Sequence, residues 1–272
     1  MKKWIYNGLI LLFAAVFLVS AGFLASYYIS SYQQSRRYEA LSSIKPAVTP
    51  RPVIPETPQE TLPQEPPPAF VEVTDPVTGE TVSLLPEFAD LYAMNRDIVG
   101  WIKIPGTKVD YPVMQTPENP DYYLKRNFDK EYSSRGCIYA REVCNLAAPS
   151  DNITLYGHRM KDGTMFGQLD KYMSADFCKE NPYIYFDYLT ELRTYEVMAV
   201  FLTTASENKG FSYHAYVDMT QEEFTEFVSI CRELSLYDTK VEAVYGDSFV
   251  SLSTCEYSQT NGRLVVVGKR IA

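Results

Sequence analysis

The sequence has few of the residues that bind transition metals, and it lacks an excess of positive charge. It contains two histidines, His158 and His214, and none of its five cysteines belongs to a C-x-x-C pair, so the ligand spacing of common metal centres is missing. Acidic residues outnumber basic ones by 34 to 25, which gives a net charge of -9. Because proteins that bind a phosphate backbone carry a basic face, we expect no nucleic-acid partner. No pattern in the sequence indicates a metal or another cofactor.

A disulfide framework is also missing. Five cysteines cannot all pair within one molecule, so at least one thiol is free or pairs between chains. A lone cysteine is most often a small buried hydrophobic residue. We interpret four of them in this way, namely Cys137, Cys144, Cys178 and Cys231. The fifth, Cys255, ends a predicted strand and is the candidate nucleophile.

Charge is absent from residues 4–29, and the block at residues 9–19 is purely apolar. As a helix, residues 4–29 would be about 39 Å long, which exceeds the hydrocarbon core of about 30 Å. We expect an uncleaved transmembrane anchor preceded by a short tail at residues 1–3. The alternative is a signal peptide cleaved near Ala21 or Ser26. Basic residues flank both ends of the segment, so the positive-inside rule does not choose an orientation.

Residues 30–80 are predicted to form a linker with proline at its centre. Residues 46–68 hold nine of the chain's seventeen prolines and few residues that could build a core. In polyproline form this stretch would span up to about 70 Å, enough to hold the following domain clear of a membrane. A proline-rich recognition ligand is the alternative interpretation.

Residues 81–272 are predicted to form one globular domain that is mainly β. A short helix is expected near Phe88, with Pro86 in its first turn. Eight runs rich in Val, Ile, Tyr and Trp follow and predict the strands of a barrel or sandwich: 98–104, 109–114, 137–140, 153–156, 183–188, 194–202, 249–254 and 264–268. One helix interrupts them at residues 220–236, where Thr220 and Glu223 fit a capping box. Its buried face is predicted to hold Phe224, Phe227, Val228, Cys231 and Leu234.

The strongest chemical signal lies near the C-terminus. The strand sequence FVSLSTC ends at Cys255, and RLVVVGKRI begins a second strand at Arg263, with the turn dipeptide Asn261-Gly262 between them. If the two strands pair as a hairpin, Cys255 and Arg263 lie at the same end of the sheet. Arginine keeps its charge at any relevant pH and presents five donors. It can therefore stabilise the oxyanion that forms when a thiolate attacks a peptide carbonyl.

A cysteine nucleophile also needs a proton partner, because an ordinary thiol with a pKa of about 8.5 is only about 3% thiolate at pH 7. His158 is the better of the two candidates, since it follows a predicted strand and stands beside Gly157, where a loop at a barrel rim would present a side chain. His214 lacks such a setting and is interpreted as a surface or packing residue. Each residue taken singly would usually be structural, so the hypothesis rests on their combination.

Together these segments resemble the sortases, and within them class B. The resemblance covers residues 83–272 and is carried by NRDIVGWIKIPGT, VDYPVMQ, RGCIYA, TLYGHRMKDGTMFGQL and SLSTC, with Arg263 eight residues beyond Cys255. It implies an eight-stranded sortase-type β-barrel with a short N-terminal helical part and one helix in the long loop before the catalytic strand, preceded by a transmembrane helix. It also implies that His158, Cys255 and Arg263 are catalytic.

The resemblance suggests binding residues as well. Ser253 and Glu256 would border a bound peptide, with the backbone N–H of Glu256 helping the oxyanion site. Asn119 and Leu124 would line the same groove.

The implied activity is that of a cysteine transpeptidase of the Gram-positive cell surface. Such an enzyme cleaves the C-terminal sorting signal of a surface protein, NPxTN-like or a related PxT motif, after its threonine. It forms a thioester and passes the acyl group to an amine of the cell-wall peptidoglycan. The catalytic domain would then lie outside the cell and residues 1–3 in the cytoplasm. The alternatives are a thiol endopeptidase that releases its product to water and a non-catalytic wall-binding domain.

Overall fold

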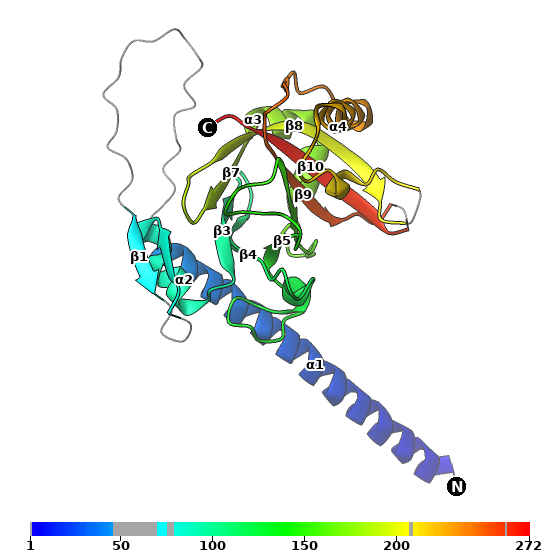
Figure 1. Cartoon of the computed structure of the whole chain (residues 1–272). Helices are drawn as coiled ribbons and strands as arrows, with labels where there is room; N and C mark the ends of the chain where they lie inside the picture. The colour runs from blue at the N-terminus through cyan, green and yellow to red at the C-terminus, as the bar shows by residue number, and fades with distance from the viewer. Residues whose placement is uncertain (1, 46–69, 75–78, 207–208, 259) are drawn as a thin grey trace. The chain divides into compact units, whose positions relative to one another are not determined.

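The chain divides into two compact units, Met1–Lys45 and Pro46–Ala272 (Figure 1). In this computed structural model, residues 2–45, 70–74, 79–206, 209–258 and 260–272 are described. The predicted proline-rich stretch at residues 46–68 lies outside the described residues.

The first unit is a single helix, α1 (Lys2–Ile44), of 43 residues. By length and composition it can cross a membrane, and it contains the predicted anchor at residues 4–29. The helix extends beyond that anchor into a stretch assigned to the linker. Residues 33–43 explain the extension, because they are rich in Gln, Arg, Glu, Ala and Leu and contain neither Pro nor Gly.

The second unit begins earlier than the predicted boundary at residue 81. A two-stranded antiparallel hairpin, β1 (Val71–Thr74) and β2 (Thr81–Leu84), pairs Val71 with Leu84 and Thr74 with Thr81. The first of these strands falls inside the predicted linker. The predicted helical part follows as η1 (Pro86–Phe88) and α2 (Ala89–Met94). Phe88 and Leu91 are fully buried, which anchors this short helix to the domain.

Eight strands close into a barrel in the order β10-β8-β7-β3-β4-β5-β6-β9. They are β3 (Ile98–Lys103), β4 (Asp110–Met114), β5 (Ile138–Ala140), β6 (Asn152–Tyr156), β7 (Tyr183–Tyr188), β8 (Thr194–Thr204), β9 (Phe249–Cys255) and β10 (Gly262–Arg270). Every one matches a predicted strand, so the eight-stranded barrel is confirmed. Pairing is antiparallel except between β4 and β5 and between β6 and β9. The parallel β6–β9 pair matters for the site because it carries two loops to the same end of the barrel.

The helix α4 (Gln221–Leu234) packs on the outside of the barrel next to β8 (Figure 1). Its predicted capping box is present: the Thr220 hydroxyl accepts from the Glu223 N–H at 3.3 Å, and the Glu223 carboxylate accepts from the Thr220 N–H at 2.9 Å. Phe227 is fully buried and its ring centroid lies 5.2 Å from that of Phe249. Phe224, Val228 and Cys231 are buried as predicted. Leu234 was predicted to be buried but is 39% exposed, because the helix ends there and its last turn leaves the core.

The connections between strands hold more helix than the one segment predicted. They contain η2 (Tyr122–Lys125), η3 (Leu169–Met173), α3 (Ala175–Glu180) and η4 (Tyr213–Ala215). None is longer than six residues, which is too short for a helical period to be recognised in the sequence.

Candidate active site

Cys255 and Arg263 face each other across the last hairpin of the barrel. Strands β9 and β10 pair antiparallel, and the register places Cys255 directly opposite Arg263. Directly opposite residues project from the same face of a sheet with neighbouring Cβ atoms, so the thiol and the guanidinium share one face. The predicted hairpin is confirmed. Cys255 is partly exposed, whereas the other four cysteines are buried, which singles out its thiol as the accessible one.

His158 follows the strand that pairs with β9 on its other side. Strand β6 runs parallel to β9 with Tyr156 opposite Ser253, and His158 stands two residues beyond Tyr156 just as Cys255 stands two beyond Ser253. Hydrogen bonds extend the pairing past the strand end: the Gly157 N–H donates to the Ser253 carbonyl at 3.2 Å, and the Thr254 hydroxyl donates to the Gly157 carbonyl at 2.8 Å. The nucleophile strand is thus flanked by the histidine strand and the arginine strand.

The His158 imidazole is oriented by a main-chain carbonyl. Its Nε2 lies 2.8 Å from the carbonyl oxygen of Leu124, and because a carbonyl can only accept, Nε2 carries a proton and donates it. The Phe166 N–H donates to the His158 carbonyl at 3.0 Å, which fixes the backbone of the residue. Leu124, predicted to line the groove, therefore also holds the histidine.

The remaining predicted binding residues fall in different environments. Ser253 is only 1% exposed, and its hydroxyl is hydrogen-bonded to the buried Tyr213 hydroxyl at 2.6 Å, so it supports the wall of the site from beneath. Asn119 is exposed in a turn where its N–H donates to the Thr116 carbonyl. Asn119 is not among the residues that line the cavity next to Arg263.

The backbone N–H of Glu256 makes a different contact from the one predicted. Its backbone N–H was predicted to help hold an oxyanion, but it donates to the Gly262 carbonyl at 2.9 Å, because the antiparallel pairing continues one residue beyond Cys255. Its carboxylate accepts hydrogen bonds from the hydroxyl and the N–H of Ser258. These bonds, with the side-chain bond as the largest cause, lower the pKa of Glu256.

An open cavity of about 570 Å³ lies next to Arg263. Other residues of its lining are Leu124, Tyr139, Arg141, Tyr156, Tyr213 and His214. His214 was interpreted as a surface or packing residue, yet it is part of this wall. Burial, with a smaller contribution from the nearby Arg141 guanidinium, lowers the pKa of His214, so its imidazole is neutral at pH 7. The connection between β8 and α4 folds so that the segment around His214 lies at this cavity. No local pattern in the sequence predicts that placement.

No group of three or more His, Cys, Asp or Glu side chains is placed to hold a metal ion within the part of the chain that the structure describes. The chemistry that this arrangement can perform is that of a thiol flanked by an imidazole and a guanidinium.

Comparison with known proteins agrees with this geometry. The family model of the Sortase domain matches residues 102–271. Sortase B of Listeria monocytogenes is 35% identical over 189 residues, which are 68% of this chain and 74% of that protein. Sortase B of Bacillus anthracis in complex with AAEK1 is 30% identical with a TM-score of 0.67, and the match covers 89% of this chain and 98% of that one. A Staphylococcus aureus sortase B-substrate complex is 33% identical with a TM-score of 0.63, covering 69% and 85%.

The chain therefore belongs to the sortase family, and within it to class B.

Proposed function

We propose that this protein is a membrane-tethered cysteine transpeptidase with Cys255 as nucleophile, His158 as proton donor and acceptor, and Arg263 as oxyanion donor. The observation that carries the proposal is the register of three adjacent strands, which pairs Cys255 with Arg263, and Ser253 with Tyr156 two residues before His158. Membership of the sortase family supports it, because sortases are known as cysteine transpeptidases.

The substrate in this proposal is the C-terminal sorting signal of a surface protein, with an NPxTN-like or related PxT motif. The Cys255 thiolate attacks the carbonyl carbon of the threonine, and the tetrahedral oxyanion collapses to a thioester as the peptide C–N bond breaks. The Nε2–H of His158 stays on the Leu124 carbonyl, and the doubly protonated ring gives its other proton, from Nδ1, to the departing amine. An amine of the peptidoglycan then attacks the thioester and gives one proton to His158, and the new amide forms as the C–S bond breaks and the Cys255 thiolate is released. The solved sortase B-substrate complex of S. aureus supports a peptide substrate for this chain as well.

Arg263 carries the oxyanion in this scheme. Its Nη1 donates to the carbonyls of Asn261 and Gly262 at 3.3 and 3.0 Å, which fixes the plane of the guanidinium at the end of the hairpin. The main-chain N–H of Glu256 is engaged in the strand pairing. Developing charge on the attacked carbonyl oxygen is therefore assigned to the arginine, whose planar fork of donors suits that task.

Helix α1 is assigned the role of anchor. Its apolar side chains from Trp4 to Tyr32 are exposed, with Phe17 at 70% and Leu18 at 68%, and such a surface is stable in lipid rather than in water. Wall precursors lie outside the cell, so residues 1–3 are placed in the cytoplasm and the barrel at the cell surface. Ser253, Glu256, Asn119 and Leu124 remain candidate contacts of the peptide.

The test is a peptide-cleavage assay with the full-length protein in detergent, in the presence of triglycine or diaminopimelate. We expect mass spectrometry to find the fragment ending in threonine joined to the amine, and Cys255→Ala to abolish its formation. Product released only as the free acid would indicate a thiol endopeptidase. Turnover unchanged in Cys255→Ala would overturn the enzymatic proposal and leave a wall-binding domain.

A further inference from the structure

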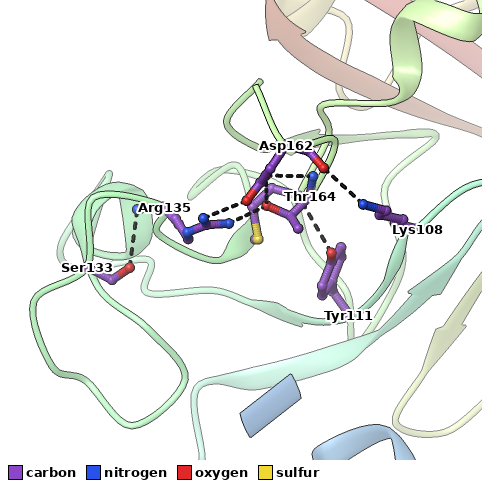
Figure 2. Close-up of polar contacts among 7 residues, drawn as sticks. Lys108, Tyr111, Ser133, Arg135, Asp162 and Thr164 are labelled. Carbon is purple, nitrogen blue, oxygen red and sulfur yellow. Dashed lines mark hydrogen bonds and ion pairs between the residues drawn. The ribbon is translucent and has the colours of Figure 1, made fainter. Parts of the chain in front are cut away.

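The loop that follows His158 is held by a network of charged and polar side chains (Figure 2). The Arg135 guanidinium donates from Nη2 to Oδ2 of Asp162 and from Nη1 to the Thr164 hydroxyl, both at 2.6 Å. The Thr164 hydroxyl in turn donates to Oδ1 of Asp162 at 2.7 Å. A single buried arginine thereby closes a ring of hydrogen bonds over the tip of the loop.

The same loop is fixed at three further points. The Lys108 ammonium donates to the Asp162 carbonyl at 3.0 Å, and the Tyr111 hydroxyl accepts from the Met165 N–H at 3.2 Å. At the base, the Phe166 N–H donates to the His158 carbonyl. The backbone of Met165 is left-handed, with φ of 53°, a conformation that a non-glycine residue keeps only when its surroundings enforce it.

The arginine–aspartate contact joins a buried cation to a partly exposed anion. The Arg135 side chain is only 5% exposed and that of Asp162 is 45% exposed. Desolvation would raise the pKa of Asp162, but hydrogen bonds from Arg135 and Thr164 outweigh it and lower the pKa to about 2. The carboxylate therefore stays charged, and the ion pair intact, throughout the neutral range.

Arg135 belongs to the same segment as the carbonyl that holds His158. Leu124 and Arg135 lie on the two arms of one loop, which is closed by bonds from the Ser133 N–H to Lys125 and from the Cys137 N–H to Tyr123 at 2.9 and 3.0 Å. Beside the arginine, Gly136 has a left-handed backbone, and a Cβ there would stand 2.5 Å from the Leu124 carbonyl oxygen. The segment that carries Arg135 therefore also packs against the Leu124 carbonyl, which accepts the hydrogen bond from the His158 Nε2–H.

We propose that Arg135 and Asp162 are positioning residues that keep the His158 Nε2–H on the Leu124 carbonyl. Two loops meet in this site, and they are joined at the imidazole and at Arg135, which binds both Asp162 and Thr164. Without the ion pair the two loops are held together less tightly, and the imidazole that must deliver a proton to the departing amine is less well positioned. The inference rests on the proposed role of His158 as proton donor.

A purely structural ion pair is the competing explanation, and the chain offers a matched control. Arg193 and Glu191 are also joined at 2.6 Å, with side-chain exposures of 7% and 40%, close to the values for Arg135 and Asp162. Their contact lies between β7 and β8 and includes none of the residues around His158. Glu191→Gln should therefore lower the stability of the fold but leave the position of the His158 imidazole unchanged.

The first measurement is steady-state kinetics of sorting-peptide cleavage by the full-length protein. For Asp162→Asn we expect kcat to fall about 10- to 100-fold with KM within about twofold, because misplacement of a reacting group by about 1 Å costs on the order of 100-fold. Arg135→Lys keeps one charge contact but cannot span both Asp162 and Thr164, so it should lie between wild type and Asp162→Asn. Glu191→Gln should keep kcat within about twofold.

The second measurement is independent of activity. With ¹⁵N-labelled histidine the spectrum contains only two imidazoles, and the resonance that disappears in His158→Gln is that of His158. Its Nε2–H signal should be sharp in wild type and in Glu191→Gln, and broadened by exchange with water in Asp162→Asn. An unchanged signal and unchanged kcat in Asp162→Asn would overturn the inference. The inference would also be overturned if kcat fell in proportion to the thermal midpoint in Asp162→Asn, Arg135→Lys and Glu191→Gln alike. Inactive wild-type protein would refute the proposed function, while the resonance would still test the positioning.

Discussion

The two sides of the nucleophile are built differently. Arg263 is fixed by the main chain, because it lies within β10 opposite Cys255 and continuous strand pairing holds both residues. His158 lies beyond the end of β6, on a loop that is held by side-chain contacts, among them Arg135 and Asp162, in addition to main-chain bonds. Backbone pairing tolerates most side-chain changes nearby, whereas a side-chain network fails when one member is removed. The arginine side should therefore be robust to substitution of its neighbours and the histidine side should be sensitive.

The difference suits the tasks assigned to the two residues. An oxyanion donor works best when it is pre-organised and does not move. A proton donor must pick up and release a proton at each turn of the reaction, and a loop at the barrel rim gives it access to both the leaving amine and the incoming one.

The largest effect is expected at the nucleophile itself. Cys255→Ala removes the thiol while leaving the β9–β10 pairing in place, so transpeptidation should fall by about 1,000-fold or more. The thermal midpoint should change little, because Cys255 is at the partly exposed end of the strand. Parallel measurement of turnover and melting checks both statements. A variant that melts far below wild type would mean that the strand end depends on its side chain, contrary to the comparison above.

Arg263→Lys tests whether backbone position alone is sufficient on the arginine side. Lysine retains the charge but loses the planar fork of donors, and loss of an oxyanion donor costs about 100- to 1,000-fold in kcat. Arg270→Lys, at the other end of β10, is the matched control and should keep kcat within about twofold. Equal rates for Arg263→Lys and wild type would remove Arg263 from the oxyanion role.

Gly136→Ala perturbs the histidine side without touching a charge. The backbone at Gly136 has φ of 58°, and the added methyl group would meet the carbonyl oxygens of Tyr123 and Leu124 at 2.5 Å. Left-handed backbone costs a non-glycine residue about 1–2 kcal/mol, and the carbonyl that holds His158 must also shift. We expect a lower thermal midpoint together with a fall in kcat of about tenfold.

Gly79→Ala is the control for the backbone strain alone. Gly79 has φ of 75°, but nothing lies within 4 Å of the position its Cβ would take. It should lower stability by a similar backbone term and leave kcat unchanged. A fall in kcat in both variants would show that the effect of Gly136→Ala is not specific to the Leu124 carbonyl.

The strand pattern and the final hairpin could be predicted because their causes are local. Runs of β-branched and aromatic residues marked all eight barrel strands, and the dipeptide Asn261-Gly262 marked the point where the last strand begins. The capping box at Thr220 was recognisable for the same reason, since its partners are three residues apart. The candidate nucleophile and oxyanion donor thus follow from short-range rules.

The contacts that position His158 could not be predicted in the same way. Arg135 and Asp162 are 27 residues apart on two irregular loops, where neither a period of 2.0 nor one of 3.6 applies. The Leu124 carbonyl belongs to the main chain, so its role as hydrogen-bond acceptor does not depend on residue type and cannot be recognised in the sequence. Whether the Glu256 N–H is free to bind an oxyanion depends on how far the β9–β10 pairing continues. Strands β1 and β2 were both missed, because four residues each, near a proline-rich stretch, give too little pattern.

The smallest expected effect is on the stability of the fold in acid. It distinguishes the histidine side of the nucleophile, where stability should depend on pH, from the arginine side, where it should not. The pKa of Asp162 is about 2 in the folded protein against an ordinary 3.8. Because the folded value is the lower one, the carboxylate stabilises the fold above about pH 4, and this contribution is lost as the pH falls from about 4 toward 2.

Asp162→Asn lacks that contribution at every pH. Urea unfolding at pH 7 should show it less stable by about 1 kcal/mol or less, since the carboxylate is 45% exposed and its ion pair is partly screened. The gap between the two proteins should close as the pH approaches 2, whereas the gap between wild type and Arg263→Lys should not depend on pH. A gap for Asp162→Asn that is constant or widens in acid would mean that the ion pair does not hold the histidine loop in the folded state.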